Sequence, residues 1–263
     1  MTRRGFIRGA AGAAAAVLGA TGARAQSGQN PRRFLAPTAY IDSTEPTVAA
    51  HAARLTAGLE TNRDKALALF AFVRDEIPFG FAGGFWAQKA SDVLAAGRGY
   101  CNTKSTLFVA LLRASGVPAR QVFVEIHASV LHGIIDAGTP YLDHSYTEVF
   151  LDGAWRATDA YIVDAALFEP AQRRVRAEER LMGYGVHATG TVRWDGHEPA
   201  FAQYNVLDPR PLGSQRWGVY ADVGDFYRHA DDPWNRQNAL VRAGFGLLAS
   251  GANRRIDAIR RGA

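Results

Sequence analysis

The most constraining feature of this chain is a pair of strand-like runs joined by the tight sequence Asp152-Gly153. Residues 144–151 and 154–160 alternate in polarity and are rich in β-branched and aromatic side chains, a pattern typical of half-buried strands. An Asp-Gly pair between two such runs favours a two-residue turn. We therefore expect an antiparallel hairpin, with residues 119–127 as a third strand of the same sheet.

Helices are expected before these strands. Apolar residues that recur at three- and four-residue steps predict a helix that Thr61 or Asn62 caps and Pro78 ends. Further helices are expected over residues 48–58, 91–96 and 101–115. The order of helices first and antiparallel strands afterwards predicts an α+β protein.

The sequence signals for helices and strands are weaker in residues 128–143 and after residue 164. Residues 128–143, which contain His132 and Asp143, are expected to be a loop between the first two strands. After residue 164 we expect a charged helix over residues 170–182, an irregular stretch to residue 234, and a last helix over residues 235–250 that Asn235 caps. The arginines beyond it are expected to form a solvated tail, namely Arg254, Arg255, Arg260 and Arg261.

The first residues have the pattern of an export signal. Arg3-Arg4 precedes a stretch rich in alanine and glycine, and Ala23-Arg24-Ala25 is a small-residue cleavage pattern. We expect residues 1–25 to be a twin-arginine signal peptide and the remainder to be periplasmic or extracellular. A membrane anchor is the alternative, but the stretch is short and weakly apolar.

Most of the chain's net positive charge belongs to this signal. Its removal takes away four arginines and no acidic residue, which lowers the formal charge from +5 to +1. The composition therefore gives no support for a nucleic-acid partner, and we expect no stable membrane insertion. No CxxC, HExxH or helix-opening GxGxxG pattern occurs, so neither a cofactor nor a metal is expected.

Cys101 is the only cysteine, so the chain has no intramolecular disulfide. It lies at the entrance of a predicted helix, where the unpaired amides of the first turn favour a thiolate, and Lys104 would act in the same direction. A single thiol kept in an oxidising compartment suggests that the thiol performs chemistry. The alternatives are a small buried side chain and a redox sensor.

The hairpin predicts which residues could assist Cys101. A two-residue turn pairs Leu151 with Ala154, and counting back from that pair places Tyr146 opposite Asp159. His144 is then a diagonal neighbour of Asp159 on the same face, about 7 Å away along the backbone. At that separation the carboxylate can orient the imidazole of His144 as the base of a catalytic triad.

Several short motifs in this order resemble the transglutaminase-like superfamily. They are Gly99-Tyr100-Cys101 at the helix entrance, Gly116-Val117-Pro118-Ala119-Arg120 after the helix, His144-Ser145-Tyr146 and Thr158-Asp159, and the resemblance covers roughly residues 47–165. It implies a papain/transglutaminase-like fold, with N-terminal helices packed on an antiparallel β-sheet. It also implies that Cys101 is the nucleophile, that His144 is the base and general acid, and that Asp159 orients His144.

The resemblance implies acyl transfer through a thioester, with a peptide or protein of the cell envelope as substrate. Hydrolysis of a peptide or amide bond is favoured over cross-linking because the sequence has no calcium loop. The alternative is an inactive peptide-binding or scaffold module of the same fold. Two residues depart from the family's usual pattern, namely Asn102 after the cysteine and Ser145 after the histidine. These departures leave open which substrate the site accepts.

The groove around the triad is expected in the aromatic segment 79–88. The backbone amide of Cys101 is the expected first oxyanion donor, Gln88 or Trp86 are candidates for the second, and Tyr146 is a groove candidate. Glu148 is expected to pair with an arginine such as Arg156. We expect residues 26–46 to be an irregular arm, residues 47–165 the catalytic core, and residues 166–263 an extension packed on that core, while the sequence leaves the oligomeric state open.

Overall fold

The sheet expected from the hairpin is present in the computed structural model, which describes residues 30–82, 88–204, 216–230 and 239–262, the last range by its backbone alone up to residue 247. Chain contacts separate Met1–Asn30 from Pro31–Ala263, and every element below belongs to the second unit. The expected signal peptide and Trp86 lie outside the described residues.

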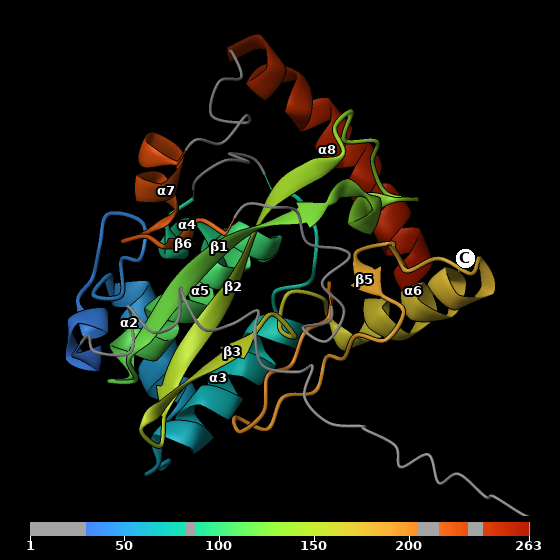
Figure 1. The fold of residues 1–263 in the computed structure, drawn as a ribbon. Coiled ribbons are helices and arrows are strands. Elements are labelled where there is room, and N and C mark those ends of the chain that lie inside the picture. The colour runs from blue at the N-terminus through green and yellow to red at the C-terminus, as the bar shows by residue number, and fades with distance from the viewer. Residues whose placement is uncertain (1–29, 83–87, 205–215, 231–238, 263) are drawn as a thin grey trace, which may run out of the picture. The chain divides into compact units, whose positions relative to one another are not determined.

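The described elements follow in this order: η1 (Pro31–Leu35), α2 (Pro46–Leu55), α3 (Asn62–Asp75), α4 (Ala90–Ala96), α5 (Cys101–Ala114), β1 (Ala119–His127), η2 (Ala128–Leu131), β2 (Tyr141–Leu151), β3 (Ala154–Thr158), α6 (Ala165–Ala177), β4 (Met182–Gly183), β5 (Val186–His187), β6 (Gly218–Val219), α7 (Val223–His229) and α8 (Ala239–Arg260). Figure 1 shows β1 and β2 side by side, with β3 beside β2. The main sheet is antiparallel, in the order β3-β2-β1-β6.

The predicted hairpin is confirmed between β2 and β3. Leu151 pairs with Ala154, and the register continues to Thr147 opposite Thr158. Asp152 and Gly153 have φ values of 49° and 79°, the left-handed conformation that a two-residue turn needs at both central positions. This register places His144 and Asp159 near each other although neither is next to the turn.

Helix α5 is the centre of the fold. It contacts α2, α3 and α4 as well as β1 and β2 (Figure 1). Every residue from Asn102 to Arg113 is buried, so the helix is covered on all sides rather than on one stripe. Its polar residues find internal partners: the Tyr161 hydroxyl lies 2.6 Å from Ser105 Oγ and 2.7 Å from Thr147 Oγ1.

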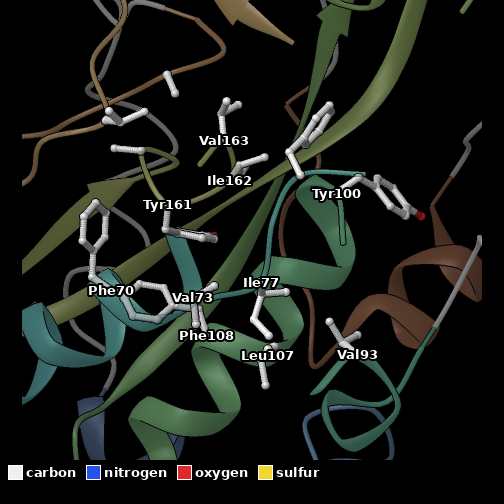
Figure 2. Close-up of a cluster of buried hydrophobic side chains, with 14 of the residues drawn as sticks. Phe70, Val73, Ile77, Val93, Tyr100, Leu107, Phe108, Tyr161, Ile162 and Val163 are labelled. Carbon is white, nitrogen blue, oxygen red and sulfur yellow. The ribbon is translucent and has the colours of Figure 1, made fainter. Parts of the chain in front are cut away.

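The core is built on aromatic rings around this helix. Figure 2 shows Phe70 of α3, Phe108 of α5 and Tyr161 close together. The ring centroids of Phe108 and Tyr161 are 4.6 Å apart, and the Phe70 ring meets Tyr161 edge-on, at an interplanar angle of 86°. These contacts tie the helix that carries Cys101 to the segment that follows Asp159.

Several expectations are corrected by the structure. Asp143 lies inside β2 rather than in a loop, because pairing of β1 with β2 extends to His127 opposite Tyr141. Helix α6 begins at Ala165 rather than at residue 170, and Pro170 lies inside it. Asp164 is its N-cap, because the Asp164 side chain accepts a hydrogen bond from the Leu167 amide. The stretch expected to be irregular contains β4, β5, β6 and α7.

The C-terminal helix is also longer than expected. Helix α8 continues to Arg260 and packs against α6. The expected solvated arginine tail is wrong for two of its members: Arg255 Nη1 donates to the Ile134 carbonyl at 2.7 Å, and Arg260 forms an ion pair with Asp164. The expected cap at Asn235 lies outside the described residues.

The turn gives a first prediction. A Cβ at residue 153 would meet no atom within 4 Å, so Gly153→Ala tests backbone strain alone. We expect a loss of about 1 kcal/mol in the free energy of unfolding, measured with urea. Gly251→Ala, in helix α8, where the added Cβ would meet only Arg254 Nη2 at 3.9 Å, is the matched control and should gain about 0.5–1 kcal/mol. Equal effects of the two substitutions would contradict the strain at the turn.

Candidate active site

Cys101 begins helix α5 and is partly exposed. The turn before it is tight: a Cβ on Gly99 would lie 2.6 Å from Thr103 Oγ1. That same Oγ1 accepts a hydrogen bond of 2.9 Å from the Tyr100 backbone amide and so caps the helix. The glycine and the threonine together hold the cysteine at the first position of a buried helix, as the sequence predicted.

Strand β2 docks on the start of this helix through alternate residues. Ser145 Oγ accepts a hydrogen bond from Gln121 Nε2 at 2.9 Å, and the same Nε2 donates to the Asn102 carbonyl at 3.1 Å. Successive side chains of a strand point to opposite faces, so His144 projects to the other side of β2 from Ser145.

The His144 ring is fixed by its neighbours on that face. Its Nε2 lies 3.2 Å from Asp159 Oδ2, and its ring meets Tyr204 edge-on at 5.7 Å. The other carboxylate oxygen of Asp159 accepts the Ala202 backbone amide. A carboxylate only accepts, so the proton between the two side chains belongs to His144 Nε2, which leaves Nδ1 as the basic nitrogen.

Three interactions place the Cys101 thiol in this neighbourhood. The backbone amides of Ser145 and Asn102 hydrogen-bond to the sulfur and favour its thiolate, and the charge of Asp159 reaches it as well. Ser145 directly follows His144, and Asp159 is the hydrogen-bond partner of His144. The structure therefore places Ser145, the residue after His144, at the Cys101 sulfur, and it places His144 at Asp159.

The expected direction of the thiol pKa is wrong. Burial raises the pKa of Cys101, the charge of Asp143 adds to that rise, and the Ser145 and Asn102 amides oppose it only in part. Lys104 does not help, because it is fully buried one turn along α5 and its Nζ donates to the Arg74 carbonyl at 3.4 Å. In the substrate-free protein the thiol is therefore protonated at neutral pH, and a nucleophilic Cys101 needs a base.

Burial lowers the pKa of Lys104 from 10.5 to about 7, against the opposing charges of Asp164 and Asp75. Between these two values the unfolded chain binds a proton that the folded protein lacks, so the stability of the wild type rises with pH across this window. We expect Lys104→Met to gain about 1–4 kcal/mol at pH 6. The gain should shrink as the pH approaches 10.

Urea unfolding of both proteins at several pH values measures this difference. Lys65→Met, a partly buried lysine of α3, is the control and should change stability by less than about 0.5 kcal/mol at every pH. A Lys104→Met gain that stays constant from pH 6 to pH 10 would exclude the lowered pKa.

Three further residues border the thiol. Asp143 Oδ2 accepts hydrogen bonds from Asn102 Nδ2 and, at 2.9 Å, from the Tyr227 hydroxyl of α7. Burial raises the pKa of Asp143, and these two hydrogen bonds oppose the rise. Asp143 was predicted to lie in a loop, although its place directly before His144 is a usable signal. Nothing in the sequence pointed to Tyr227.

The remaining site candidates have mixed positions. Gln88 is buried directly before α4, and its role as an oxyanion donor stays a prediction. Tyr146 packs against Phe201 and Tyr204 on the His144 face, as a groove residue could. Glu148 pairs with Arg120 Nε at 2.6 Å rather than with Arg156.

The described part of the chain holds no group of three His, Cys, Asp or Glu side chains suited to a metal ion. No helix among these residues is long and apolar enough to cross a membrane. A cavity of about 590 Å³ lies between the segment His127–Pro140, Arg180 and Arg255, and none of the triad candidates lines it.

Two solved structures are similar to part of this chain. A provisionally named cysteine protease from Cytophaga hutchinsonii is 22% identical over 48% of this chain, with a TM-score of 0.39. A provisionally named protease from Parabacteroides distasonis is 15% identical over 48% of this chain, with a TM-score of 0.33. This chain spans 39% and 24% of their lengths, so their activities are not transferred to it. No curated protein matches the sequence.

The family comparison covers the residues that carry the resemblance. Residues 49–160 match the family model described as the transglutaminase-like superfamily, and this range includes Cys101, His144 and Asp159. The helices followed by an antiparallel sheet agree with the papain/transglutaminase-like α+β fold that the resemblance implied. Residues 49–160 of this chain are therefore similar to the transglutaminase-like superfamily.

Proposed function

We propose that this chain is an exported cysteine hydrolase that cleaves a peptide or amide bond by acyl transfer through Cys101, His144 and Asp159. The observation that carries the proposal is the buried His144–Asp159 hydrogen bond beside the entrance of α5. This bond leaves His144 Nδ1 as the basic nitrogen, on the residue directly before Ser145, whose backbone amide hydrogen-bonds to the Cys101 sulfur.

The reaction follows from the protonated thiol. His144 Nδ1 takes the Cys101 proton as the sulfur attacks the substrate carbonyl, and Asp159 stabilises the imidazolium that forms. The backbone amide of Cys101, outside the hydrogen-bond ladder of its helix, is the expected oxyanion donor. The imidazolium then protonates the leaving amine, which breaks the C–N bond. Water, activated by the same nitrogen, releases the acyl group from the thioester.

Export and substrate location rest on the sequence alone. The Arg3-Arg4 signal pattern supports the twin-arginine route and a substrate in the cell envelope. The raised pKa of Cys101 favours a second candidate, an inactive peptide-binding module of the same fold. The two candidates differ in whether His144 activates the thiol.

Labelling of Cys101 with iodoacetamide separates them, because the chain has no other cysteine. At pH 7 we expect the wild type to react at least as fast as glutathione despite its raised pKa, and His144→Ala to react at least about tenfold more slowly. His132→Ala, an exposed histidine outside the triad, is the control. Equal rates for the wild type and His144→Ala would favour the inactive module.

A further inference from the structure

Asp143 is a carboxylate that acts on the Cys101 thiol. In the described ranges no lysine or arginine forms an ion pair with it, and its neighbours at Oδ2 are Asn102 and Tyr227. Glu125 of β1 is directly opposite in the register of the sheet. Directly opposite residues of antiparallel strands share a face, so two like charges occur side by side.

This arrangement works against the nucleophile. After burial, the charge of Asp143 is the next largest influence that raises the pKa of Cys101. A positive charge placed at Asp143 would offset that influence and favour the thiolate. His144, the next residue of β2, acts on Asp143 when its ring is charged, but no lysine or arginine among the residues that the structure describes pairs with this carboxylate.

The side-chain amide of Asn102 belongs to the same site. Its Nδ2 points into the same cluster, with hydrogen bonds to Asp143 and to the Tyr227 hydroxyl at 2.8 Å. Its Oδ1 is buried and has no partner among the described residues. Buried acceptors are normally paired, so this oxygen indicates a donor that is still to arrive. A carboxylate and an amide oxygen together suit a group that is positively charged and carries N–H bonds.

We propose that Asp143 determines specificity by receiving an ammonium or guanidinium group carried by the acyl donor, with Asn102 Oδ1 as a second acceptor. The proposal rests on the proposed function, since it names the substrate class of the same site. Binding of the cation then has two effects: it holds the acyl donor beside Cys101, and it offsets the influence by which the Asp143 charge raises the pKa of the thiol.

The charge at the sulfur can be measured without turnover. Cys101 is treated with a cationic reagent, 2-(trimethylammonium)ethyl methanethiosulfonate, and with the anionic 2-sulfonatoethyl analogue. In both, the thiolate displaces methanesulfinate and forms a mixed disulfide, so the reagents differ mainly in charge. The rate of each reagent with Cys101 is divided by the rate of the same reagent with glutathione, which corrects for the intrinsic reactivity of the reagent.

We expect the cationic reagent to be favoured at least about tenfold in the wild type, and Asp143→Asn to lose about tenfold of that preference. Asp136→Asn, an exposed acid in the loop before β2, is the matched control and should keep it. Tyr227→Phe removes a hydroxyl and no charge, so it should also keep the preference. A wild type without preference, or an unchanged preference in Asp143→Asn, would overturn the proposal even if the enzyme is active.

A second measurement locates the cation on the acyl donor. Release of p-nitrophenolate is compared for the p-nitrophenyl esters of 6-aminohexanoate and hexanoate. We expect faster acylation by the cationic ester in the wild type and no such advantage in Asp143→Asn. If instead added methylammonium accelerates deacylation after the neutral ester and the cationic ester has no advantage, the cation belongs to an acceptor and the acyl-donor assignment is wrong. Failure of both esters to acylate Cys101, with the reagent preference intact, would contradict the proposed function alone.

Discussion

The Cys101→Ala variant is expected to lose the burst of p-nitrophenolate that the wild type releases from p-nitrophenyl acetate, with acylation slower by at least about 10³-fold. The physical reason is that Cys101 is the only thiol, so no other side chain can form the thioester. Alanine is small enough for this position at the start of α5, and the fold should be retained, which circular dichroism checks.

The companion variant Asp159→Asn tests the orienting role. Asp159 accepts N–H bonds at both oxygens, from His144 Nε2 and from the Ala202 amide. Asparagine offers one carbonyl oxygen, so one of the two contacts must fail. If its amide nitrogen faces His144, the ring takes the tautomer with a protonated Nδ1 and cannot act as the base. We expect acylation to fall by about 10²–10⁴-fold.

Asp136→Asn provides the same chemical change at an exposed position and should leave the burst unchanged. Wild-type rates in Asp159→Asn would mean that the buried carboxylate has a structural role only. A burst that persists in Cys101→Ala would show that the ester reacts at another residue, and the triad would then have no support.

The largest effect on stability is expected for Asp164→Ala. The Asp164 carboxylate is 3% exposed and accepts hydrogen bonds from Arg260, at 2.9 Å and 2.7 Å, and from the Phe79 amide at 3.0 Å. It also caps α6 through the Leu167 amide. Its removal leaves the Arg260 guanidinium without its buried partner and takes away the negative charge that most strongly favours the charged form of Lys104. We expect a loss of about 3–5 kcal/mol in the free energy of unfolding.

Urea unfolding at pH 7 measures this loss, and Glu169→Ala, an exposed acid of α6, is the control with a change below about 0.5 kcal/mol. The effect should depend on pH. Burial opposes ionisation of Asp164, but the hydrogen bonds and charge of Arg260 outweigh it and hold its pKa below 3.8. The contribution is therefore complete above this value and is lost as the pH falls through the lower, folded pKa. A loss below 1 kcal/mol would mean that water satisfies Arg260.

The local signals in the sequence were reliable for the core of the fold. The Asp152-Gly153 turn sets the register of β2 and β3, because a two-residue turn leaves one way to pair the strands. The Thr61 cap and the following apolar spacing gave α3, and the glycine entrance gave the start of α5 at Cys101. These features depend on residues close together in the chain.

The signals failed where distant segments decide the outcome. Arg260 looked like part of a solvated tail, because its partner Asp164 is 96 residues earlier and no local pattern connects them. Lys104 looked like a charge that would assist the thiol, but burial in the core lowers its pKa instead. Asp143 looked like a loop residue because the length of β2 is set by its pairing with β1.

The sequence by itself determined the α+β order of elements, the hairpin register and the three residues proposed as a triad, since turn geometry and periodicity are local properties. Only the tertiary structure decided the electrostatic state of the site. The direction of the Cys101 pKa follows from how much water the packed chain excludes, and from the Asp143 carboxylate that Asn102 and the distant Tyr227 hold beside the sulfur. Desolvation and long-range contacts arise only when the whole chain is packed.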